Sequence, residues 1–211
     1  MIAVVDYGMG NLRSVAKALE RVGADVEVTS DPERIEDADG VVLPGVGAFG
    51  KCMENLVAAG LEGSVRDAAK SGKPFLGVCV GMQILFEESE EFGPVRGLGI
   101  LPGRVKKFMP RDPSQKVPHM GWNTLDLRNR VPALRGIADG AYVYFVHSYY
   151  VETDDQTLVA STTPYGVSFA SSVARGNLFA TQFHPEKSQA VGLKMLANFA
   201  ESAEQATRIR A

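Results

Sequence analysis

An apolar run that passes straight into a helical pattern constrains the fold more than any other part of this chain. Pro74–Val78 is typical of a buried strand, and Gly81–Phe86 continues as a helix with no loop between them. The join reads Gly77-Val78-Cys79-Val80-Gly81. We predict a strand that enters a sharp turn and then a helix, because a glycine on each side removes side chains that would collide there.

Cys79 lies at the tip of this predicted turn, two residues from each glycine. Hydrolases with the same elbow carry a serine nucleophile at this position. At the start of the following helix, the helix dipole would favour a thiolate, and free backbone N–H groups would receive an oxyanion. The alternative is a buried structural cysteine between two packing glycines. The short motif alone does not decide between these interpretations.

Composition indicates a single globular domain over residues 1–211. With 45% hydrophobic residues the chain can bury a sizeable core, and a net charge of −3 argues against nucleic-acid binding. Met1–Asn11 lacks the charged start of a signal peptide, and no apolar run reaches the ~20 residues of a membrane span. Two cysteines make no disulfide framework, and Cys52 lies in a helical pattern that predicts a core position. We therefore expect a cytoplasmic enzyme with no membrane contact, metal or cofactor.

Strand and helix patterns alternate through the first half of the chain. Between the apolar runs, hydrophobic residues recur with helical spacing, and Asp31-Pro32 has the form of a helix start. This alternation predicts a parallel sheet with helices on both faces. The predicted strands are Ile2–Asp6, Asp25–Thr29 and Gly40–Leu43, and the predicted helices are Leu12–Val22, a short helix from Asp31, Lys51–Ala59 and Leu61–Lys70.

The second half of the chain is largely β. Phe92–Gly103 is rich in glycine and proline and predicts a loop, whereas Ser188–Ala203 predicts a final amphipathic helix. The fold class is therefore α/β, with a mixed, mostly parallel central sheet, helices on both faces and a smaller antiparallel β portion. The predicted strands of this half are Val105–Phe108, Val117–Leu127, Ala141–Glu152, Leu158–Thr162, Val167–Arg175 and Leu178–Gln182.

Glycine-rich turns follow the first and third predicted strands. Gly8-Met9-Gly10 lacks the third glycine and the later acidic residue of a dinucleotide-binding fingerprint, so we reject that function for it. Pro44-Gly45-Val46-Gly47 should lie beside the Cys79 turn, because parallel strands end at the same edge of a sheet. Its flexible backbone can turn an N–H group of Val46 or Gly47 toward a developing oxyanion.

A second candidate stretch lies near the C-terminus. His184 ends a predicted strand and is followed by Pro185 and Glu186. A thiol nucleophile needs an imidazole within hydrogen-bond reach and a group that orients the imidazole. Pro185 restricts the backbone, so Glu186 should stay close to His184. The alternative is a strand-end histidine beside a solvated glutamate. The other histidines, His119 and His147, lie in β patterns and are interpreted as structural.

Three motifs together resemble the class I glutamine amidotransferases. They are G-x-C-x-G-M-Q, P-G-x-G and Q-F-H-P-E, and the resemblance covers essentially the whole chain. It implies a three-layer, flavodoxin-like fold and the hydrolysis of L-glutamine to glutamate and ammonia. It also implies a catalytic triad, in which Cys79 attacks the side-chain amide, His184 transfers the proton and Glu186 orients His184.

The resemblance further implies where the oxyanion and the substrate bind. The N–H groups of Val80 and of the Val46–Gly47 turn would hold the oxyanion. Gln83 follows Cys79 by one helical turn and so shares its face, although an ordinary helix-surface position is the alternative. The residues implied for the glutamine pocket are Gly45, Gln83, Ser148 and Tyr149.

Four stretches resemble one branch of that family more closely: Asp6–Asn11, Pro44–Phe49, His119–Asn123 and Tyr144–Tyr149. Members of this branch pass ammonia to a separate cyclase barrel in histidine biosynthesis, so the resemblance implies a heterodimer with a cyclase subunit. Trp122 is the only tryptophan, and it is interpreted either as an interface anchor or as a core residue. The residues implied at the partner interface are Asn11, Trp122, Tyr144 and Lys187.

Two other functions stay open at this point. One is the glutaminase subunit of another synthase, such as pyridoxal phosphate synthase. The stretches Tyr-Gly-Met-Gly-Asn and His-Met-Gly-Trp-Asn argue against it. The other is a non-catalytic amidotransferase-like protein that only binds a partner, and the intact Cys79, His184 and Glu186 argue against that.

Overall fold

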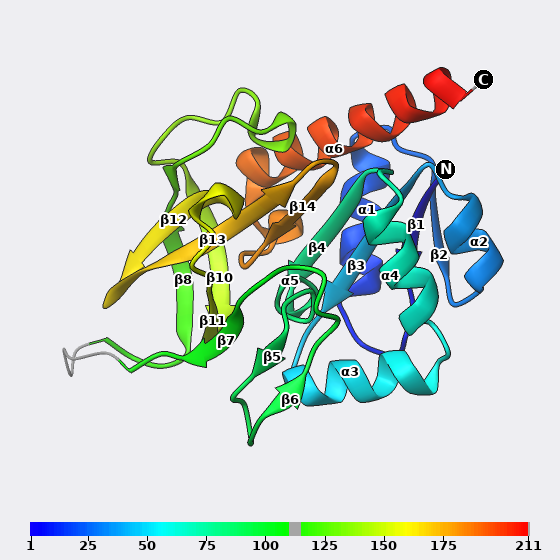
Figure 1. The fold of residues 1–211 in the computed structure, drawn as a ribbon. Coiled ribbons are helices and arrows are strands. Elements are labelled where there is room, and N and C mark those ends of the chain that lie inside the picture. Colours follow the sequence, from blue (N-terminus) through cyan, green and yellow to red (C-terminus); the bar gives the residue numbers. More distant parts are fainter. Residues whose placement is uncertain (110–114, 211) are drawn as a thin grey trace.

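Five parallel strands form the centre of the molecule in this computed structural model, which describes residues 1–109 and 115–210 (Figure 1). They lie in the order β2-β1-β3-β4-β14, which is the order of flavodoxin-like open sheets. Because β14 pairs with β4, the segment that follows β14 emerges beside the segment that follows β4. The bounds are β1 Ile2–Val5, β2 Val26–Thr29, β3 Gly40–Gly45, β4 Phe75–Cys79 and β14 Leu178–Thr181.

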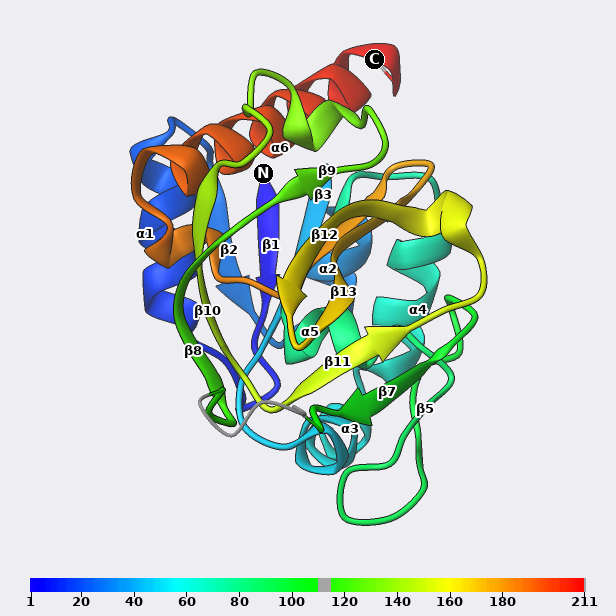
Figure 2. The same ribbon diagram turned by 90° about the vertical axis from the view of Figure 1, so that its left-hand side faces the viewer.

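Helices cover both faces of these strands, as the alternating pattern predicts. Figure 2 shows α1 and α6 on one side of the strands and α2 and α4 on the other. The predicted apolar stripe of α1 is buried at Val15, Ala16 and Leu19, and the Asp31 carboxylate caps α2 by accepting the N–H of Glu33 at 2.9 Å. The bounds are α1 Leu12–Arg21, α2 Pro32–Asp37, α3 Phe49–Ala58, α4 Glu62–Lys70 and α6 Gln189–Arg210.

Beyond β14 the main sheet continues with antiparallel pairing through β13 and β11. A separate antiparallel pair, β8 and β10, forms a small second sheet. The predicted class, an α/β fold with a smaller antiparallel portion, is therefore confirmed. The bounds are β5 Glu88–Ser89, β6 Val95–Arg96, β7 Arg104–Lys107, β8 His119–Thr124, β9 Asp126–Leu127, β10 Tyr142–His147, β11 Tyr149–Glu152, β12 Val159–Tyr165 and β13 Val167–Arg175, with short 3-10 helices at Pro132–Leu134, Gln156–Leu158 and Pro185–Lys187.

Two predicted strands are each divided in the structure, because the chain changes sheet within them. Ala141–Glu152 breaks at Ser148, where β10 leaves its pairing with β8 and β11 begins to pair with β7. Val117–Leu127 breaks at Leu125, where β8 ends and β9 turns to pair with β12. The break at Ser148 brings that residue to the edge of the sheet where Cys79 lies.

The helix predicted over Gly81–Phe86 is also shorter, since α5 spans only Val80–Gln83. The carbonyl oxygens that follow, of residues 84–86, accept backbone hydrogen bonds from residues 98–101, so they are not available to a longer helix. The predicted loop Phe92–Gly103 thus packs closely on α5, and it contains the short strand β6. A four-residue helix has a small dipole, so backbone N–H groups matter more to Cys79 than the dipole does.

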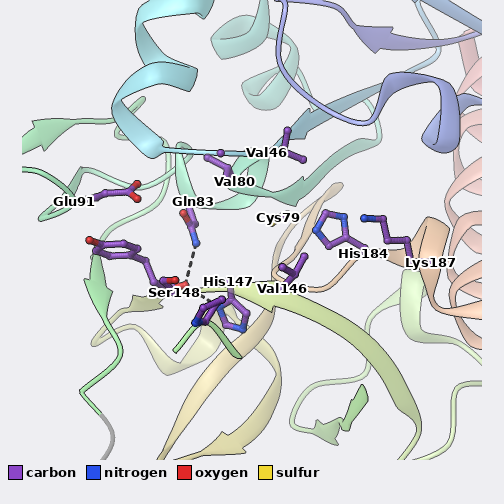
Figure 3. A pocket seen from close by; sticks show the side chains of 13 residues that line it. Val46, Cys79, Val80, Gln83, Glu91, Val146, His147, Ser148, His184 and Lys187 are labelled. Atoms are coloured by element: carbon purple, nitrogen blue, oxygen red, sulfur yellow. Dashed lines mark hydrogen bonds between the residues drawn. The ribbon is translucent and has the colours of Figure 1, made fainter. Parts of the chain in front are cut away.

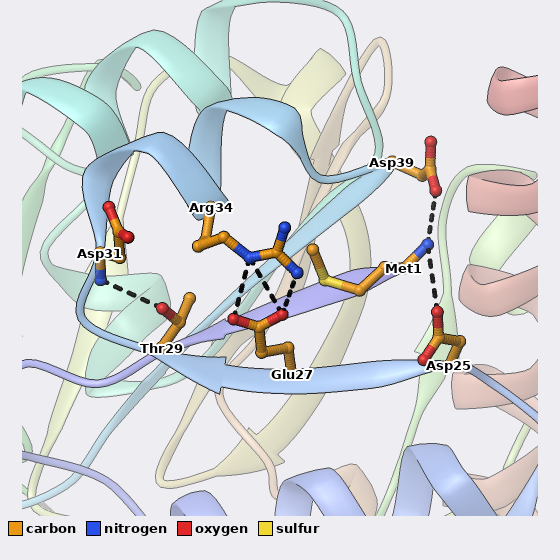
Figure 4. A network of polar contacts seen from close by, with 7 residues as sticks. All are labelled: Met1, Asp25, Glu27, Thr29, Asp31, Arg34 and Asp39. Atoms are coloured by element: carbon orange, nitrogen blue, oxygen red, sulfur yellow. Dashed lines mark hydrogen bonds and ion pairs between the residues drawn. The ribbon is translucent and has the colours of Figure 1, made fainter.

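A polar network holds the N-terminal edge of the sheet, away from these segments (Figure 4). The Met1 ammonium lies 2.5 Å from the Asp39 carboxylate, and Arg34 of α2 forms an ion pair with Glu27 of β2. An exposed pair such as Arg34–Glu27 contributes little to stability, typically about 0–1 kcal/mol. Within residues 1–109 and 115–210, no helix is both long and apolar enough to cross a membrane.

Candidate active site

Cys79 adopts the strained backbone that the glycine pattern predicts. It ends β4 with φ 56° and ψ −113°, and Val80 begins α5 directly after it. A non-glycine residue at positive φ costs about 1–3 kcal/mol and persists only where surrounding contacts enforce it. The backbone packs closely at Gly81, where an added Cβ would lie 1.9 Å from the carbonyl oxygen of Leu43. It also packs closely at Gly77, where an added Cβ would lie 3.0 Å from the carbonyl oxygen of Gly81.

His184 and Glu186 lie where β14 ends, beside Cys79. Parallel pairing of β14 with β4 sets Thr181 next to Val78, so the next residues of both strands emerge together. His184 Nδ1 lies 2.8 Å from Glu186 Oε1, and the two side chains are 2% and 1% exposed. Two buried atoms of this pair, His184 Nε2 and Glu186 Oε2, make no hydrogen bond to the described residues.

The charge state of His184 follows from its neighbours. Burial by itself would lower the pKa of this imidazole, but the thiol of Cys79 and the carboxylate of Glu186 outweigh burial and raise the pKa to about 10. A ring that holds a proton between a thiol and a carboxylate is suited to pass that proton to a leaving group. The structure therefore brings together the three residues that the sequence singles out for the triad.

Gln182 is a further contact of the nucleophile, and the sequence analysis missed it. Its side-chain amide Nε2 donates to Cys79 Sγ at 3.8 Å, and its Oε1 accepts from Gln83 Nε2 at 2.9 Å. Gln83 Nε2 also donates to the carbonyl oxygen of Tyr149 at 3.1 Å. The signal was present, because Gln182 belongs to the Q-F-H-P-E motif and precedes His184 by two residues.

The Pro44–Gly47 turn lies beside the elbow, as predicted from the parallel strands. The pairing of β3 with β4 sets Gly45 opposite Cys79, and a Cβ on Gly45 would lie 2.5 Å from the Gly81 nitrogen. Two buried side chains hold carbonyl groups of this turn. The Tyr7 hydroxyl donates to Pro44 O at 2.7 Å, and the Cys52 thiol donates to Val46 O at 3.4 Å.

Cys52 itself is buried in the core, as predicted. Burial raises the pKa of its thiol to about 11, so it stays neutral near pH 7 and does not compete with Cys79 as a nucleophile. Burial likewise raises the pKa of Tyr7, which keeps its hydroxyl a hydrogen-bond donor.

A cavity of about 340 Å³ opens in front of Cys79 (Figure 3). It has the size of a small-ligand site. Gly45 does not line it and lies behind it against the elbow backbone. Glu91 lines the cavity near Gln83, and Lys187 lines it at the other end beside His184. The sequence-predicted residues that line it are Val46, Gly47, Cys79, Val80, Gln83, Ser148, Tyr149, His184 and Lys187.

Among the residues predicted for the partner interface, Lys187 lines this cavity and Tyr144 lies beside Lys187. Trp122 is 45% exposed and contacts the Tyr144 ring edge-on, with 6.0 Å between ring centroids, so the core interpretation of Trp122 is wrong. Lys187 Nζ lies 5.9 Å from the centre of the Tyr144 ring. Asn11 precedes α1, which contacts the 3-10 helix that carries Lys187.

Among the residues that the structure describes, no three side chains of His, Cys, Asp or Glu are grouped so that they could hold a metal ion.

Comparison with known families agrees with this geometry. The family described as "Glutamine amidotransferase class-I" matches residues 3–203. The chain belongs to this family. It is 53% identical over 206 residues to the imidazole glycerol phosphate synthase subunit HisH of Syntrophotalea carbinolica, covering 95% of this chain and 100% of that protein. It is 57% identical over 206 residues to the subunit of the same name from Nitrosomonas europaea, covering 94% and 96%.

Among solved structures, that of PurLQS from Thermotoga maritima has a TM-score of 0.70 to this chain. The identity is 21% and 97% of each chain is covered, so this likeness shows a shared fold alone. The two curated relatives identify the chain more finely, as an amidotransferase of the HisH type.

Proposed function

We propose that this chain is the glutaminase subunit of an imidazole glycerol phosphate synthase, working as one amidotransferase domain over residues 1–211 with L-glutamine as its substrate. The observation that carries the proposal is the geometry at Cys79. A strained elbow cysteine stands beside an imidazole whose far nitrogen is held by a buried carboxylate. That is the arrangement a thiol nucleophile, its proton carrier and an orienting group require.

The reaction follows from these three side chains. The Cys79 thiolate attacks the side-chain amide carbon of glutamine, and the carbonyl oxygen becomes an oxyanion held by backbone N–H groups of Val80 and the Val46–Gly47 turn. Protonated His184 gives its proton to the leaving nitrogen, which departs as ammonia and leaves a thioester. Water then attacks the thioester, His184 takes the proton, and glutamate leaves. Glu186 holds the ring in position throughout.

Substrate recognition needs groups for the ammonium and the carboxylate of the amino acid. Glu91 supplies a negative charge inside the cavity, and its Oε2 is fixed by the Phe49 N–H at 2.7 Å. We assign the substrate ammonium to Glu91 because ionised partners make the stronger hydrogen bonds. Ser148 and Tyr149 line the same cavity and would bind the substrate carboxylate.

The partner would be a cyclase subunit that receives the ammonia and forms a heterodimer with this chain. One face of the β8–β10 sheet exposes Met120, Trp122 and Tyr142, and the half-buried Tyr144 on the same face lies beside Lys187 of the cavity. Tryptophan and tyrosine are the residues that most often anchor interfaces. Asn11 and Lys187 would add polar contacts at the rim. A partner docked here covers the exit of the cavity, so that ammonia enters the partner and not the solvent.

The Pro44–Gly47 turn suggests that the partner also switches on hydrolysis. In this structure its Val46 carbonyl is held by the Cys52 thiol, which keeps the turn in one orientation. If only another orientation aims an N–H at the oxyanion, the isolated chain lacks a donor that is worth about 10²–10³ in rate. A partner that binds the competent orientation more tightly would restore that rate.

The test is glutamine turnover by the purified chain alone, then with the cyclase, then with the cyclase and its nucleotide ligand. We expect turnover to be low for the chain alone and to rise at each step. Full turnover by the isolated chain would remove the activation by the partner and leave a free-standing glutaminase. No turnover under any condition, with Cys79 unreactive toward a glutamine-derived electrophile, would favour a non-catalytic binding protein.

A further inference from the structure

A chain of hydrogen bonds runs from the β8–β10 sheet to the wall of the glutamine cavity. Asn123 Nδ2 lies 3.3 Å from His119 Nε2, and His119 Nδ1 lies 2.9 Å from His147 Nε2. His147 Nδ1 in turn lies 2.8 Å from the carbonyl oxygen of Tyr149. The same oxygen accepts the amide of Gln83. Every ring nitrogen of the two histidines therefore has a partner.

The direction of each bond is determined by the last acceptor. A carbonyl oxygen can only accept, so the proton of His147 must sit on Nδ1. In a neutral ring, Nε2 is then an acceptor, and the His119 proton must sit on its Nδ1. His119 Nε2 is left to accept from Asn123, whose Nδ2 also donates to Pro164 O at 3.0 Å. One protonation pattern satisfies every group.

The surroundings keep both rings neutral. Aromatic rings enclose them, with His119 stacked on Phe145 and Tyr165 at centroid distances of 4.8 and 3.9 Å. Burial lowers the pKa of His119 to about 4 and that of His147 to about 3. The charged group that acts on His147 from across the cavity is His184, which disfavours a second positive charge.

The chain of hydrogen bonds ends at the carbonyl oxygen of Tyr149, and this end determines the shape of the cavity wall. Tyr149 O fixes the amide of Gln83, whose Nε2 donates to Tyr149 O and to Gln182 Oε1. With both amide hydrogens used, the Gln83 oxygen is the part of this side chain left to accept from a ligand. The other end of the chain lies on β8, where Asn123 directly follows the exposed Trp122.

We propose that His119 and His147 are positioning residues that hold the Tyr149 carbonyl and the Gln83 amide in place for glutamine, and that they couple the proposed docking face to the glutamine cavity. This inference rests on the proposed function. The hydrogen bonds that carry this coupling run between two sheets. The polypeptide joins these sheets where β10 ends and β11 begins, at Ser148.

The two functions of the His147 ring can be separated with a matched pair of variants, assayed as the complex with the cyclase. In His147→Asn the amide nitrogen can replace ring Nδ1 and still donate to Tyr149 O, but the bond to His119 is lost. In His147→Gln the amide oxygen can replace Nε2 and keep the His119 bond, but the donor to Tyr149 O is lost. We expect the KM for glutamine of His147→Gln to exceed that of His147→Asn about five- to tenfold, the effect of one buried hydrogen bond, with similar kcat. Equal KM values in two folded variants would overturn the positioning role.

The coupling is tested by the ratio of turnover with the cyclase to turnover without it. We expect His147→Asn to lower this activation ratio about fivefold or more, because its cavity wall is held but no longer connected to β8. An activation ratio equal to that of the unmodified chain would overturn the coupling. If the unmodified complex itself hydrolyses no glutamine, the proposed function fails instead, so the two failures are distinguishable.

A measurement on the unmodified chain does not depend on how the variants fold. The chain has three histidines, so ring ¹⁵N spectra can be assigned by comparison with His119→Asn and His147→Asn. We expect both rings to be neutral at pH 7 with the proton on Nδ1. A proton on Nε2 of either ring, or a charged ring, would overturn the proposal.

Discussion

Two histidine sites reach the same cavity, one through His184 and the other through His147, and they behave in opposite ways. His184 and the His119–His147 pair are all nearly inaccessible, with 2%, 3% and 6% of their surface exposed. Burial acts on each of them to lower the pKa. It prevails at His119 and His147, whose pKa values fall to about 4 and 3. At His184 the thiol of Cys79 and the carboxylate of Glu186 outweigh burial, and the pKa rises to about 10.

Hydrogen bonding distinguishes the two sites as clearly as charge does. Each nitrogen of the His119–His147 pair has a partner, which is the normal condition of buried polar groups. At the triad, His184 Nε2 and Glu186 Oε2 have none within the described residues. A buried polar atom without a partner is costly, so it marks a position that a reacting group can occupy. Depth of burial alone therefore does not separate the positioning histidines from the reacting one.

Removing the thiol of Cys79 should have the largest effect on the contrast between His184 and the His119–His147 pair. In Cys79→Ala we expect glutaminase activity of the cyclase complex to fall by at least about 10⁴-fold, because no nucleophile remains. The pKa of His184 should fall as well, because the thiol is the stronger of the two influences that raise it. Steady-state glutamine turnover and a ring NMR titration measure the two effects.

The ammonia-dependent reaction provides the control for this variant. The folded Cys79→Ala complex should still form its product from added ammonium, since the cyclase needs only ammonia. Loss of both reactions in a folded complex would contradict the transfer of ammonia between the subunits.

Weakening the orienting group should have the next largest effect. In Glu186→Gln the His184 ring keeps a neighbour at Nδ1, but the negative charge of that neighbour is lost. We therefore expect the loss of turnover to be roughly 10- to 100-fold smaller than the loss in His184→Ala. The pKa of His184 should fall less than it does in Cys79→Ala. Equal and complete losses of turnover in folded Glu186→Gln and His184→Ala would show that Glu186 does more than orient the ring.

The triad could be predicted from sequence because its determinants are local. The glycines around Cys79 and the proline between His184 and Glu186 act on the backbone of their own segments. Alternation of strands and helices likewise sets the parallel order that brings β4 and β14 together. Local patterns therefore led to the elbow, to the candidate residues of the triad and to the fold class, and the family resemblance implied the roles of the three residues.

The features of the fold and the site that were not predicted depend on contacts between distant segments. The break at Ser148 arises because β10 and β11 pair in different sheets, and the early end of α5 arises because the 98–101 segment takes its carbonyl bonds. The His119–His147 bond exists only in the β8–β10 register, which pairs these two residues directly. Glu91 reaches the cavity from the β5–β6 hairpin, and neither strand of this hairpin was predicted. No local pattern could reveal these contacts.

Gln182 links the two histidine sites, because it contacts Cys79 of the triad and also Gln83 of the cavity wall. Changing Gln182 should therefore affect both sites. Gln182→Met keeps the volume but removes the donor to Cys79 Sγ and the acceptor for Gln83. We expect kcat/KM for glutamine to fall about tenfold, the size of one to two buried hydrogen bonds. The ammonium-dependent activity should be unchanged, and kcat/KM within twofold of the unmodified complex would show that Gln182 only fills space.

The smallest expected effect is on the pH dependence of stability. His119 and His147 have folded pKa values below the ~6.5 of an unfolded histidine, so the unfolded chain binds more protons in mild acid. Their contribution to stability is complete above about pH 6.5 and is lost as the pH falls toward 4, by about 1.4 kcal/mol per pH unit for each ring. His184, whose folded pKa is raised, is protonated in both states below pH 6.5 and adds no slope there.

Urea unfolding between pH 4.5 and about 6.5 measures how the free energy of unfolding changes with pH. Its slope against pH should be smaller for His147→Asn than for the unmodified chain. Because the carboxylates are the same in both proteins, equal slopes would mean that His147 is charged in the folded state, which would erase the contrast with His184.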